Sequence, residues 1–209
     1  MDKIKVILFD MDGVLIDAKD WHYNALNKAL KIANINISRE EHLKIYDALP
    51  TQQKLEILSK RKKLDKSLHP LIQQQKQQYT LEYIHKRCQP TPYHIEALKR
   101  LQDRGYRMAV CSNSIRESIN IMMKKSQLEE FFDFYISNED VQYGKPHPEM
   151  YLKAMERFNI TPQETLIVED SEKGIQAATA SGAYVMRVNS INDVTYENIM
   201  RHILMFQKS

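Results

Sequence analysis

The chain has 209 residues, with 30 basic and 27 acidic side chains and a net charge of +3 at neutral pH. This length is enough to bury a core without a disulfide scaffold, as one domain or as one domain with a modest insertion. A charge so close to balance argues against nucleic acid as the main partner. The two cysteines, Cys88 and Cys111, lack the spacing of metal ligands and indicate reduced thiols in a cytoplasmic protein.

The first apolar run covers residues 5–9 and ends at Asp10. It is shorter than the apolar core of a signal peptide, which needs roughly 7 to 15 residues. No later run approaches the roughly 20 apolar residues of a membrane-spanning helix. We therefore expect a cytoplasmic protein with no membrane partner.

Further apolar runs alternate with helical patterns along the chain. The runs cover residues 5–9, 107–111, 134–136, 166–168 and 184–188, and helical patterns cover 93–104, 115–125, 149–158 and 174–181. Strands that are apolar throughout and alternate with helices are typical of a parallel sheet covered on both faces. The sequence predicts an α/β fold with a Rossmann-like, doubly wound parallel sheet.

Roughly 75 residues of helical character separate the first strand from the second, which is far too long for a loop. We interpret residues 17–87 as an inserted α-helical cap domain, and residues 1–16 and 88–209 as the core domain. A closing amphipathic helix over 193–206 is expected to bury one stripe of side chains, formed by Val194, Ile199, Ile203 and Leu204. The first cap helix is expected to bury one stripe of side chains, formed by Trp21, Ala25, Ala29 and Ile32.

Carboxylates follow two of the predicted strands at the end where ligands bind in open parallel sheets. Asp10 and Asp12 come after the first strand, and Glu169 and Asp170 after the fourth. Four carboxylates in one place repel one another unless a cation is present. Oxygen ligands without histidine or thiol partners favour magnesium, so Mg²⁺ is the expected cofactor.

Lys145 lies next to Pro146, just before a predicted helix. Proline fixes the backbone there, which would aim the lysine inward, where its amine can neutralise a carboxylate and a phosphate oxygen together. An ordinary surface lysine is the alternative interpretation. Its place beside the carboxylates favours the inward position.

Asp10 and Asp12 are two residues apart, which in an extended chain places both side chains on the same side. One carboxylate can attack a phosphate while the other handles a proton. Ser112, Asn113 and the amides of the following helix can hold phosphate oxygens, although a serine there serves equally well as a helix cap. The pattern predicts an enzyme that transfers a phosphoryl group through an aspartyl-phosphate.

Four segments together resemble the motifs of the haloacid dehalogenase superfamily of phosphotransferases. They are residues 9–15, 111–113, 144–146 and 168–174, in that order. The resemblance is to the branch with a helical cap, which includes β-phosphoglucomutase and phosphoglycolate phosphatase. It implies that Asp10 is the nucleophile and Asp12 the general acid and base. True dehalogenases of this family lack the second aspartate, which argues against carbon–halogen cleavage.

The same resemblance implies phosphate and metal ligands. Ser112 and Lys145 would bind the phosphate, with Asn113 beside them. His22 falls where many members carry a histidine near the start of the cap, and it could contact a leaving group; packing is the alternative role. The implied metal ligands are Asp10, the backbone carbonyl of Asp12 and Asp170, with Glu169 close by or reaching the metal through water.

The predicted function is hydrolysis of a small phosphate monoester, such as a sugar phosphate, by a magnesium-dependent phosphatase. A phosphatase needs only the core motifs and a cap that excludes water. The expected partner is this small phosphorylated metabolite, and the chain is expected to be a monomer or weak dimer.

Two alternatives stay open. A phosphomutase resembling β-phosphoglucomutase would hold a second phosphate through an arginine and a lysine of the cap, but residues 49–53 contain no arginine. Lys76 is a candidate for the lysine, and Ala18 stands where mutases often have a hydroxyl. A non-catalytic binding protein is the second alternative, because a fold alone does not prove activity. Whether Glu139 and Asp140 join the site also stays open.

Overall fold

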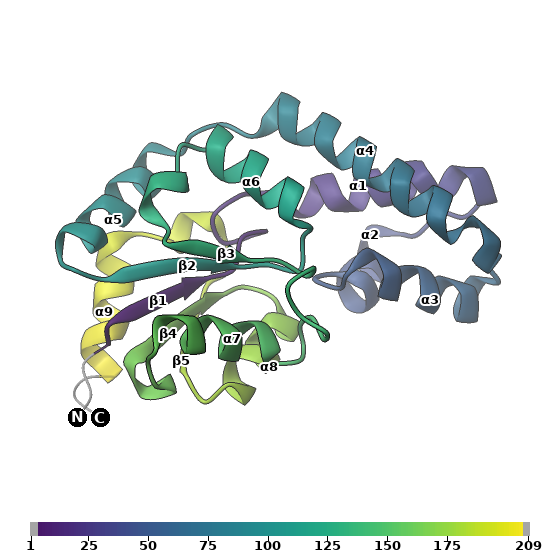
Figure 1. Cartoon of the computed structure of the whole chain (residues 1–209). Helices are drawn as coiled ribbons and strands as arrows, with labels where there is room; N and C mark the ends of the chain where they lie inside the picture. Colours follow the sequence, from purple (N-terminus) through teal and green to yellow (C-terminus); the bar gives the residue numbers. More distant parts are fainter. Residues whose placement is uncertain (1–3, 207–209) are drawn as a thin grey trace. The chain divides into compact units, whose positions relative to one another are not determined.

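The structure is a computed structural model that describes residues 4–206 (Figure 1). Five parallel strands of the described chain form one sheet in the order β3-β2-β1-β4-β5, which confirms the expected doubly wound sheet. The strands are β1 (Val6–Phe9), β2 (Arg107–Cys111), β3 (Phe134–Ile136), β4 (Thr165–Glu169) and β5 (Tyr184–Arg187).

The central strand β1 is apolar and fully buried, as expected for a strand covered on both faces. Its neighbour β4 is also buried at every position, and Phe9 lies opposite Val168. The ladder continues one residue further, because the amide of Asp10 donates to the carbonyl of Val168 at 3.0 Å. The carboxyl ends of β1 and β4 therefore lie side by side.

Helices cover both faces of the sheet (Figure 1). One face carries α7 (Glu149–Phe158) and α8 (Glu172–Ala180), and the other carries α5 (Pro92–Asp103) and α6 (Arg116–Lys125). The last helix, α9 (Tyr196–Phe206), contacts α5 and β5. The chain changes face between the connections that follow β1 and β4, so the ends of these two strands form the switch point where ligands bind in such folds.

Residues Ala18–Cys88 form a compact unit of their own, which we call the cap unit, and the rest of the described chain forms the core unit. The cap unit is helical, and α1 packs against α4. Its helices are α1 (Lys19–Leu30), α2 (Arg39–Glu41), the π-helical turn η2 (His42–Tyr46), α3 (Thr51–Lys62) and α4 (His69–Arg87). The short 3₁₀ turns of the two units are η1 (Lys31–Ala33), η3 (Lys66–Leu68), η4 (Glu129–Phe131), η5 (Pro162–Glu164) and η6 (Ile191–Asp193).

Two side chains that we expected to be buried are exposed. Ile32 is 46% exposed, because α1 ends at Leu30 and the following turn interrupts the helical stripe. Leu204 is 51% exposed, because it follows the buried Ile203 and one residue turns the helix by about 100°. The other members of both predicted stripes are buried as expected: Trp21, Ala25 and Ala29 in α1, and Val194, Ile199 and Ile203 at the end of the chain.

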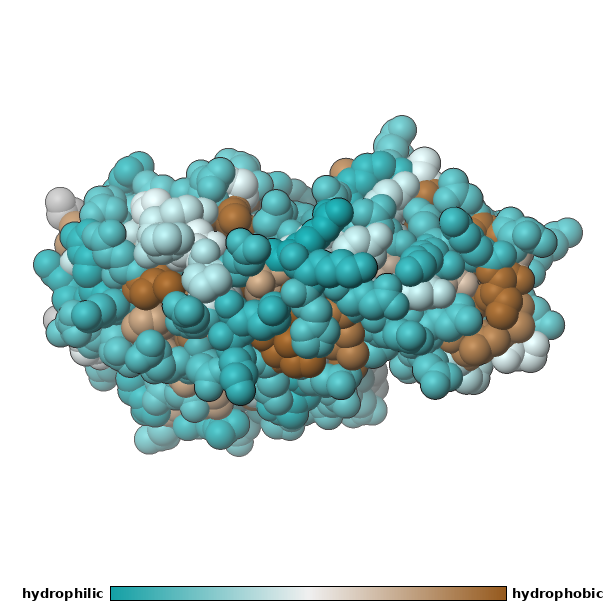
Figure 2. Space-filling model, turned by 90° about the horizontal axis from the view of Figure 1, so that it is seen from above, coloured by the Kyte–Doolittle hydropathy of each residue, from teal (hydrophilic) through white to brown (hydrophobic). Residues whose placement is uncertain are grey.

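The surface seen from above is mostly hydrophilic, with several separate hydrophobic patches (Figure 2). Among the described helices, none combines the length and apolar character needed to cross a membrane. Cys88 and Cys111 are both buried, and residues 4–206 contain no disulfide.

Candidate active site

Three carboxylates meet where β1 and β4 end. Asp10 follows β1, Glu169 closes β4 and Asp170 comes next, and one oxygen of each lies within 4.8 Å of the others. Asp10 and Glu169 are buried, with 8% and 0% of their surface exposed. A buried group of oxygen ligands of this kind fits a hard divalent cation such as Mg²⁺. The structure thus brings together three of the expected metal ligands.

Lys145 is the positive charge of this cluster. It is only 1% exposed, and its Nζ donates to Asp10 Oδ1 at 2.5 Å, to the carbonyl of Cys111 at 2.8 Å and to Glu169 Oε1. Burial disfavours the charged amine, but Asp10 and Glu169 raise the pKa of Lys145 above its ordinary value. The amine is therefore a permanent ammonium that points inward.

The carboxyl group of Asp10 is in an unfavourable place for a negative charge. Burial raises the pKa of Asp10 well above its ordinary value, and Glu169, Asp170 and Asp12 raise it further, while Lys145 lowers it. A divalent cation bound among the carboxylates would offset this repulsion and keep Asp10 ionised. The repulsion within the acidic cluster would thus be lower with a bound metal ion than without one.

The carboxylate of Asp12 is held by serines that follow β2. The hydroxyl of Ser114 donates to Asp12 Oδ2 at 2.8 Å, and that of Ser112 lies 3.4 Å from the same oxygen. The turn that carries Asp12 closes through a 2.7 Å bond from the amide of Gly13 to the carbonyl of Ile16, with Gly13 at a φ of +102°. We had not singled out Ser114, although its place two residues after Ser112 was a usable signal.

Asn113 contacts Lys145 through its side chain. Its Oδ1 accepts from the backbone amide of Lys145 at 3.0 Å, and its Nδ2 donates to the backbone carbonyl of Lys145 at 3.2 Å. We expected Asn113 beside the phosphate. The two bonds fix the backbone from which the lysine side chain projects.

Glu169 is bonded at both oxygens. Oε1 accepts from Lys145 and, at 2.6 Å, from the hydroxyl of Tyr151, while Oε2 accepts from the amide of Asp170 at 3.1 Å. A Cβ atom added to Gly174 would lie 2.0 Å from Oε1. The carboxylate therefore occupies space that only a glycine leaves open. Tyr151 was missed from the sequence, because it lies in an ordinary helical stripe of α7.

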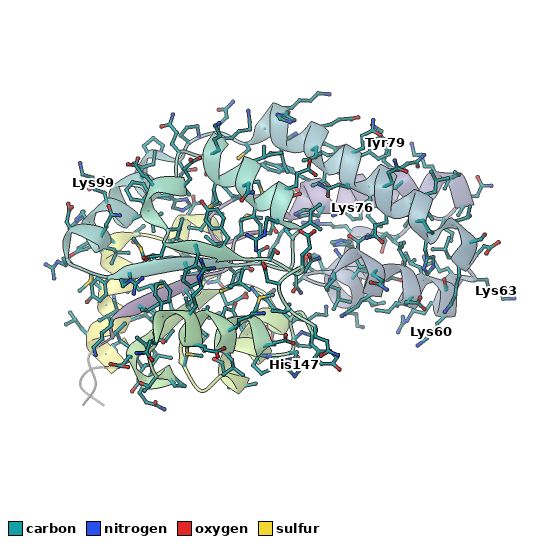
Figure 3. The ribbon with its side chains drawn as sticks, viewed as in Figure 1. Lys60, Lys63, Lys76, Tyr79, Lys99 and His147 are labelled. Carbon is teal, nitrogen blue, oxygen red and sulfur yellow. The ribbon has the colours of Figure 1, made fainter. Side chains whose placement is uncertain are left out.

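His22 lies in the cap unit, and the other predicted site residues lie in the core unit. Within the cap unit, Nδ1 of His22 on α1 lies 3.3 Å from Nζ of Lys76 on α4. Lys76, labelled in Figure 3, is only 8% exposed. The structure thus pairs the two cap residues that we had considered separately as ligands of a substrate.

Glu139 and Asp140 are engaged in the loop after β3. Glu139 Oε2 accepts from the amide of Arg116 at the start of α6 at 2.6 Å. Asp140 accepts from the amide of Ser137 at 2.7 Å and pairs with the Arg116 side chain. Burial opposes ionisation of Asp140, but the bonds from Arg116 and Ser137 lower its pKa to about 2. The pair therefore caps the loop and the start of α6.

The chain is similar to a known family and to known enzymes. Residues 7–188 match the family of haloacid dehalogenase-like hydrolases. The phosphorylated carbohydrates phosphatase of Thermotoga maritima is 26% identical over 195 residues, which cover 91% of this chain and 88% of that protein. The pyrophosphatase PpaX of Oceanobacillus iheyensis is 26% identical over 194 residues, which cover 92% and 87%.

Solved structures give the same fold. A β-phosphoglucomutase of Clostridium difficile superposes with a TM-score of 0.84 at 21% identity, covering 99% of this chain and 100% of that one. A structure described as a predicted phosphoglycolate phosphatase of Haemophilus somnus gives a TM-score of 0.77 at 22% identity, covering 96% and 98%. At these identities the likeness bears on the fold alone.

The family match spans most of the chain and both of its units. The expected enzyme class, a hydrolase of phosphoric esters, is confirmed by this match and by curated relatives named as phosphatases. The motifs that suggested a resemblance have thus led to the correct family: the chain belongs to the haloacid dehalogenase-like hydrolases.

Proposed function

We propose that the protein is a magnesium-dependent phosphatase that hydrolyses a small phosphate monoester through an aspartyl-phosphate on Asp10. The observation that carries the proposal is the buried ammonium of Lys145, 2.5 Å from Asp10 and also bonded to Glu169. A permanent cation beside a carboxylate nucleophile serves to attract and orient a phosphate dianion.

In the first half of the reaction, a carboxylate oxygen of Asp10 attacks phosphorus. The bond from phosphorus to the ester oxygen breaks, and protonated Asp12 gives its proton to the departing oxygen. Ser112 and Lys145 hold the phosphoryl oxygens as negative charge shifts among them. The products are the free alcohol and a phosphoryl group bound to Asp10.

In the second half, Asp12, now ionised, takes a proton from a water molecule. The oxygen of that water attacks phosphorus, and the bond from phosphorus to Asp10 breaks. Inorganic phosphate leaves, Asp10 is again a carboxylate, and Asp12 is again protonated for the next cycle. The hydroxyl of Ser114 keeps the Asp12 carboxylate in place.

Asp10, Asp170 and the backbone carbonyl of Asp12 would hold the magnesium, with Glu169 nearby. When bound, Mg²⁺ would supply positive charge that lowers the repulsion between Asp10 and the incoming phosphate. The fit is supported by the cluster of Asp10, Asp170 and the neighbouring Glu169, which offers only oxygen atoms, within 4.8 Å of one another.

The proposed substrate class is sugar phosphates. Its support is the relative from Thermotoga maritima, which is named a phosphorylated carbohydrates phosphatase and matches 91% of this chain. The related pyrophosphatase PpaX makes pyrophosphate the first competitor to test.

The direct test is release of inorganic phosphate from a panel of sugar phosphates, nucleotides, phosphoglycolate and pyrophosphate, with and without Mg²⁺. Wild type and Asp10→Asn are compared on each compound. We expect release that requires Mg²⁺ and is lost in the variant. Equal background release from both proteins on every compound would overturn the proposal.

One observation favours a second candidate, a phosphomutase. Lys76 is 8% exposed in the cap unit and bonded to His22, so the cap carries a nearly buried cation of the kind that binds a second phosphate group. Incubation with a hexose monophosphate and its bisphosphate separates the two functions. A mutase gives an isomeric sugar phosphate, and a phosphatase gives inorganic phosphate.

A further inference from the structure

Tyr151 is the fully buried tyrosine of α7, with 0% of its surface exposed. Its hydroxyl donates to Glu169 Oε1 at 2.6 Å, and its ring lies 5.0 Å from the ammonium of Lys145. Burial and the neighbouring carboxylates raise the pKa of Tyr151 well above its ordinary value, so the phenol keeps its proton and remains a donor. A polar group placed this deep needs a partner, and Glu169 is that partner.

The bonds of Glu169 show what the tyrosine does there. A carboxylate oxygen offers about two lone-pair positions. Those of Oε1 are taken by Lys145 and Tyr151, and Oε2 accepts from the amide of Asp170 at 3.1 Å, with the hydroxyl of Ser171 at 3.5 Å. With Tyr151 in place, Oε1 has no position left for a metal ion.

We infer that Tyr151 is a positioning residue that holds Glu169 as the counter-ion of Lys145 and keeps this carboxylate from binding the metal directly. The three carboxylates of the cluster are thereby divided between two tasks. Asp10 and Asp170 are left for the magnesium, and Glu169 fixes the lysine that faces the phosphate. This inference deepens the proposed function and rests on it for the role of Lys145.

The substitution Tyr151→Phe removes one oxygen and keeps the ring against Lys145. Glu169 Oε1 then regains a lone pair that can turn to the metal, and the carboxylate carries more negative charge. We therefore expect the dissociation constant of Mg²⁺ to fall by about threefold or more, and kcat to fall by about tenfold, with KM changed by less than about threefold. Tighter Mg²⁺ binding together with a lower kcat distinguishes a positioning role from a general loosening of the fold. A loosened fold would lower both the affinity for Mg²⁺ and kcat.

The experiment uses the full chain. Titration calorimetry with Mg²⁺ alone gives the dissociation constant, and phosphate release gives kcat and KM. Tyr46→Phe is the matched control, because Tyr46 is also 0% exposed but its hydroxyl is 3.5 Å from Glu41 in the cap unit. We expect this control to behave as wild type in both measurements.

An unchanged or raised dissociation constant for Mg²⁺ in Tyr151→Phe would overturn the inference, as would a kcat within about twofold of wild type. The calorimetric measurement does not depend on turnover. If wild type releases no phosphate from any compound, the proposed function fails, while the change in Mg²⁺ affinity still decides whether Tyr151 governs Glu169.

Discussion

Lys145 of the core unit and Lys76 of the cap unit are both nearly buried lysines, and they are held in different ways. Lys145 is 1% exposed and bonded to the carboxylates of Asp10 and Glu169, whereas Lys76 is 8% exposed and bonded to the imidazole of His22. A carboxylate adds a negative charge that favours the ammonium form of a lysine, whereas a neutral imidazole nitrogen accepts one hydrogen bond from the lysine without adding a charge. We propose that Lys145, which is bonded to the proposed nucleophile, takes part in the reaction itself, and that Lys76 takes part in recognition of the substrate.

The largest expected effect is that of Lys145→Met. Loss of the ammonium should lower kcat by about a hundred- to a thousandfold, as for other preorganised donors that stabilise a transition state. It also leaves Asp10 and Glu169 buried without their counter-ion, which should cost about 3–5 kcal/mol in the free energy of unfolding. Phosphate release and urea unfolding measure the two effects. A variant with wild-type kcat would remove Lys145 from the mechanism.

Gly174→Ala tests the packing behind Lys145. Alanine usually stabilises a helix by about 1 kcal/mol relative to glycine. Here its Cβ would lie 2.0 Å from Glu169 Oε1, so we expect the opposite sign, a loss of about 2 kcal/mol, and a kcat lowered by about tenfold. Thermal and urea unfolding check the sign, with the exposed Gln176→Ala in the same helix as the control. A more stable variant would show that the carboxylate moves away freely.

Lys76→Met is the matching substitution in the cap unit. If Lys76 serves recognition, KM for a sugar bisphosphate should rise by about tenfold, while kcat and KM for a monophosphate stay within about threefold. Steady-state kinetics with both substrates measure the difference. A loss of kcat as large as that of Lys145→Met would contradict the proposal that the two lysines have different roles.

The smallest expected effect is that of Asp140→Asn, at a strand end outside the carboxylate cluster. The pKa of Asp140 is lowered from 3.8 to about 2. Its stabilisation is therefore present above about pH 4 and is lost as the pH falls through about 2. Because the side chain is 28% exposed, we expect only about 1 kcal/mol at pH 7 after screening by solvent, and kcat within about twofold.

Urea unfolding of Asp140→Asn at pH 7 and at about pH 2 measures this window, since the variant and wild type should converge at the lower pH. Asp103→Asn, exposed at the end of α5, is the control. A difference from wild type that persists at low pH would mean that the amide disturbs the loop itself rather than removing a charge.

The local pattern of apolar and polar residues in the sequence predicted most of the fold and the centre of the site. The apolar runs at 107–111 and 134–136 coincide with β2 and β3, because buried parallel strands have a distinctive composition. The ends of such strands meet at one edge of the sheet. For that reason Asp10, Glu169 and Lys145 could be placed together before their contacts were known.

What the sequence did not predict depends on contacts between distant segments. The bonds between Asn113 and Lys145 join residues 32 positions apart, and that between Tyr151 and Glu169 joins residues 18 positions apart. Helical periodicity marks Tyr151 as buried but does not say what its hydroxyl contacts. Ile32 and Leu204 were wrongly predicted to be buried for a related reason. Packing sets the residue at which a helix ends and the direction in which each of its side chains points.

The most direct test of the account is chemical trapping of the phosphoryl group on Asp10. Wild-type protein is mixed with Mg²⁺ and the best substrate of the panel, quenched in acid during turnover and analysed by peptide mass spectrometry. We expect one added phosphoryl group on the peptide that contains Asp10, removed by hydroxylamine and absent from Asp10→Asn. Rapid phosphate release with no such adduct, or an adduct on another residue, would contradict it.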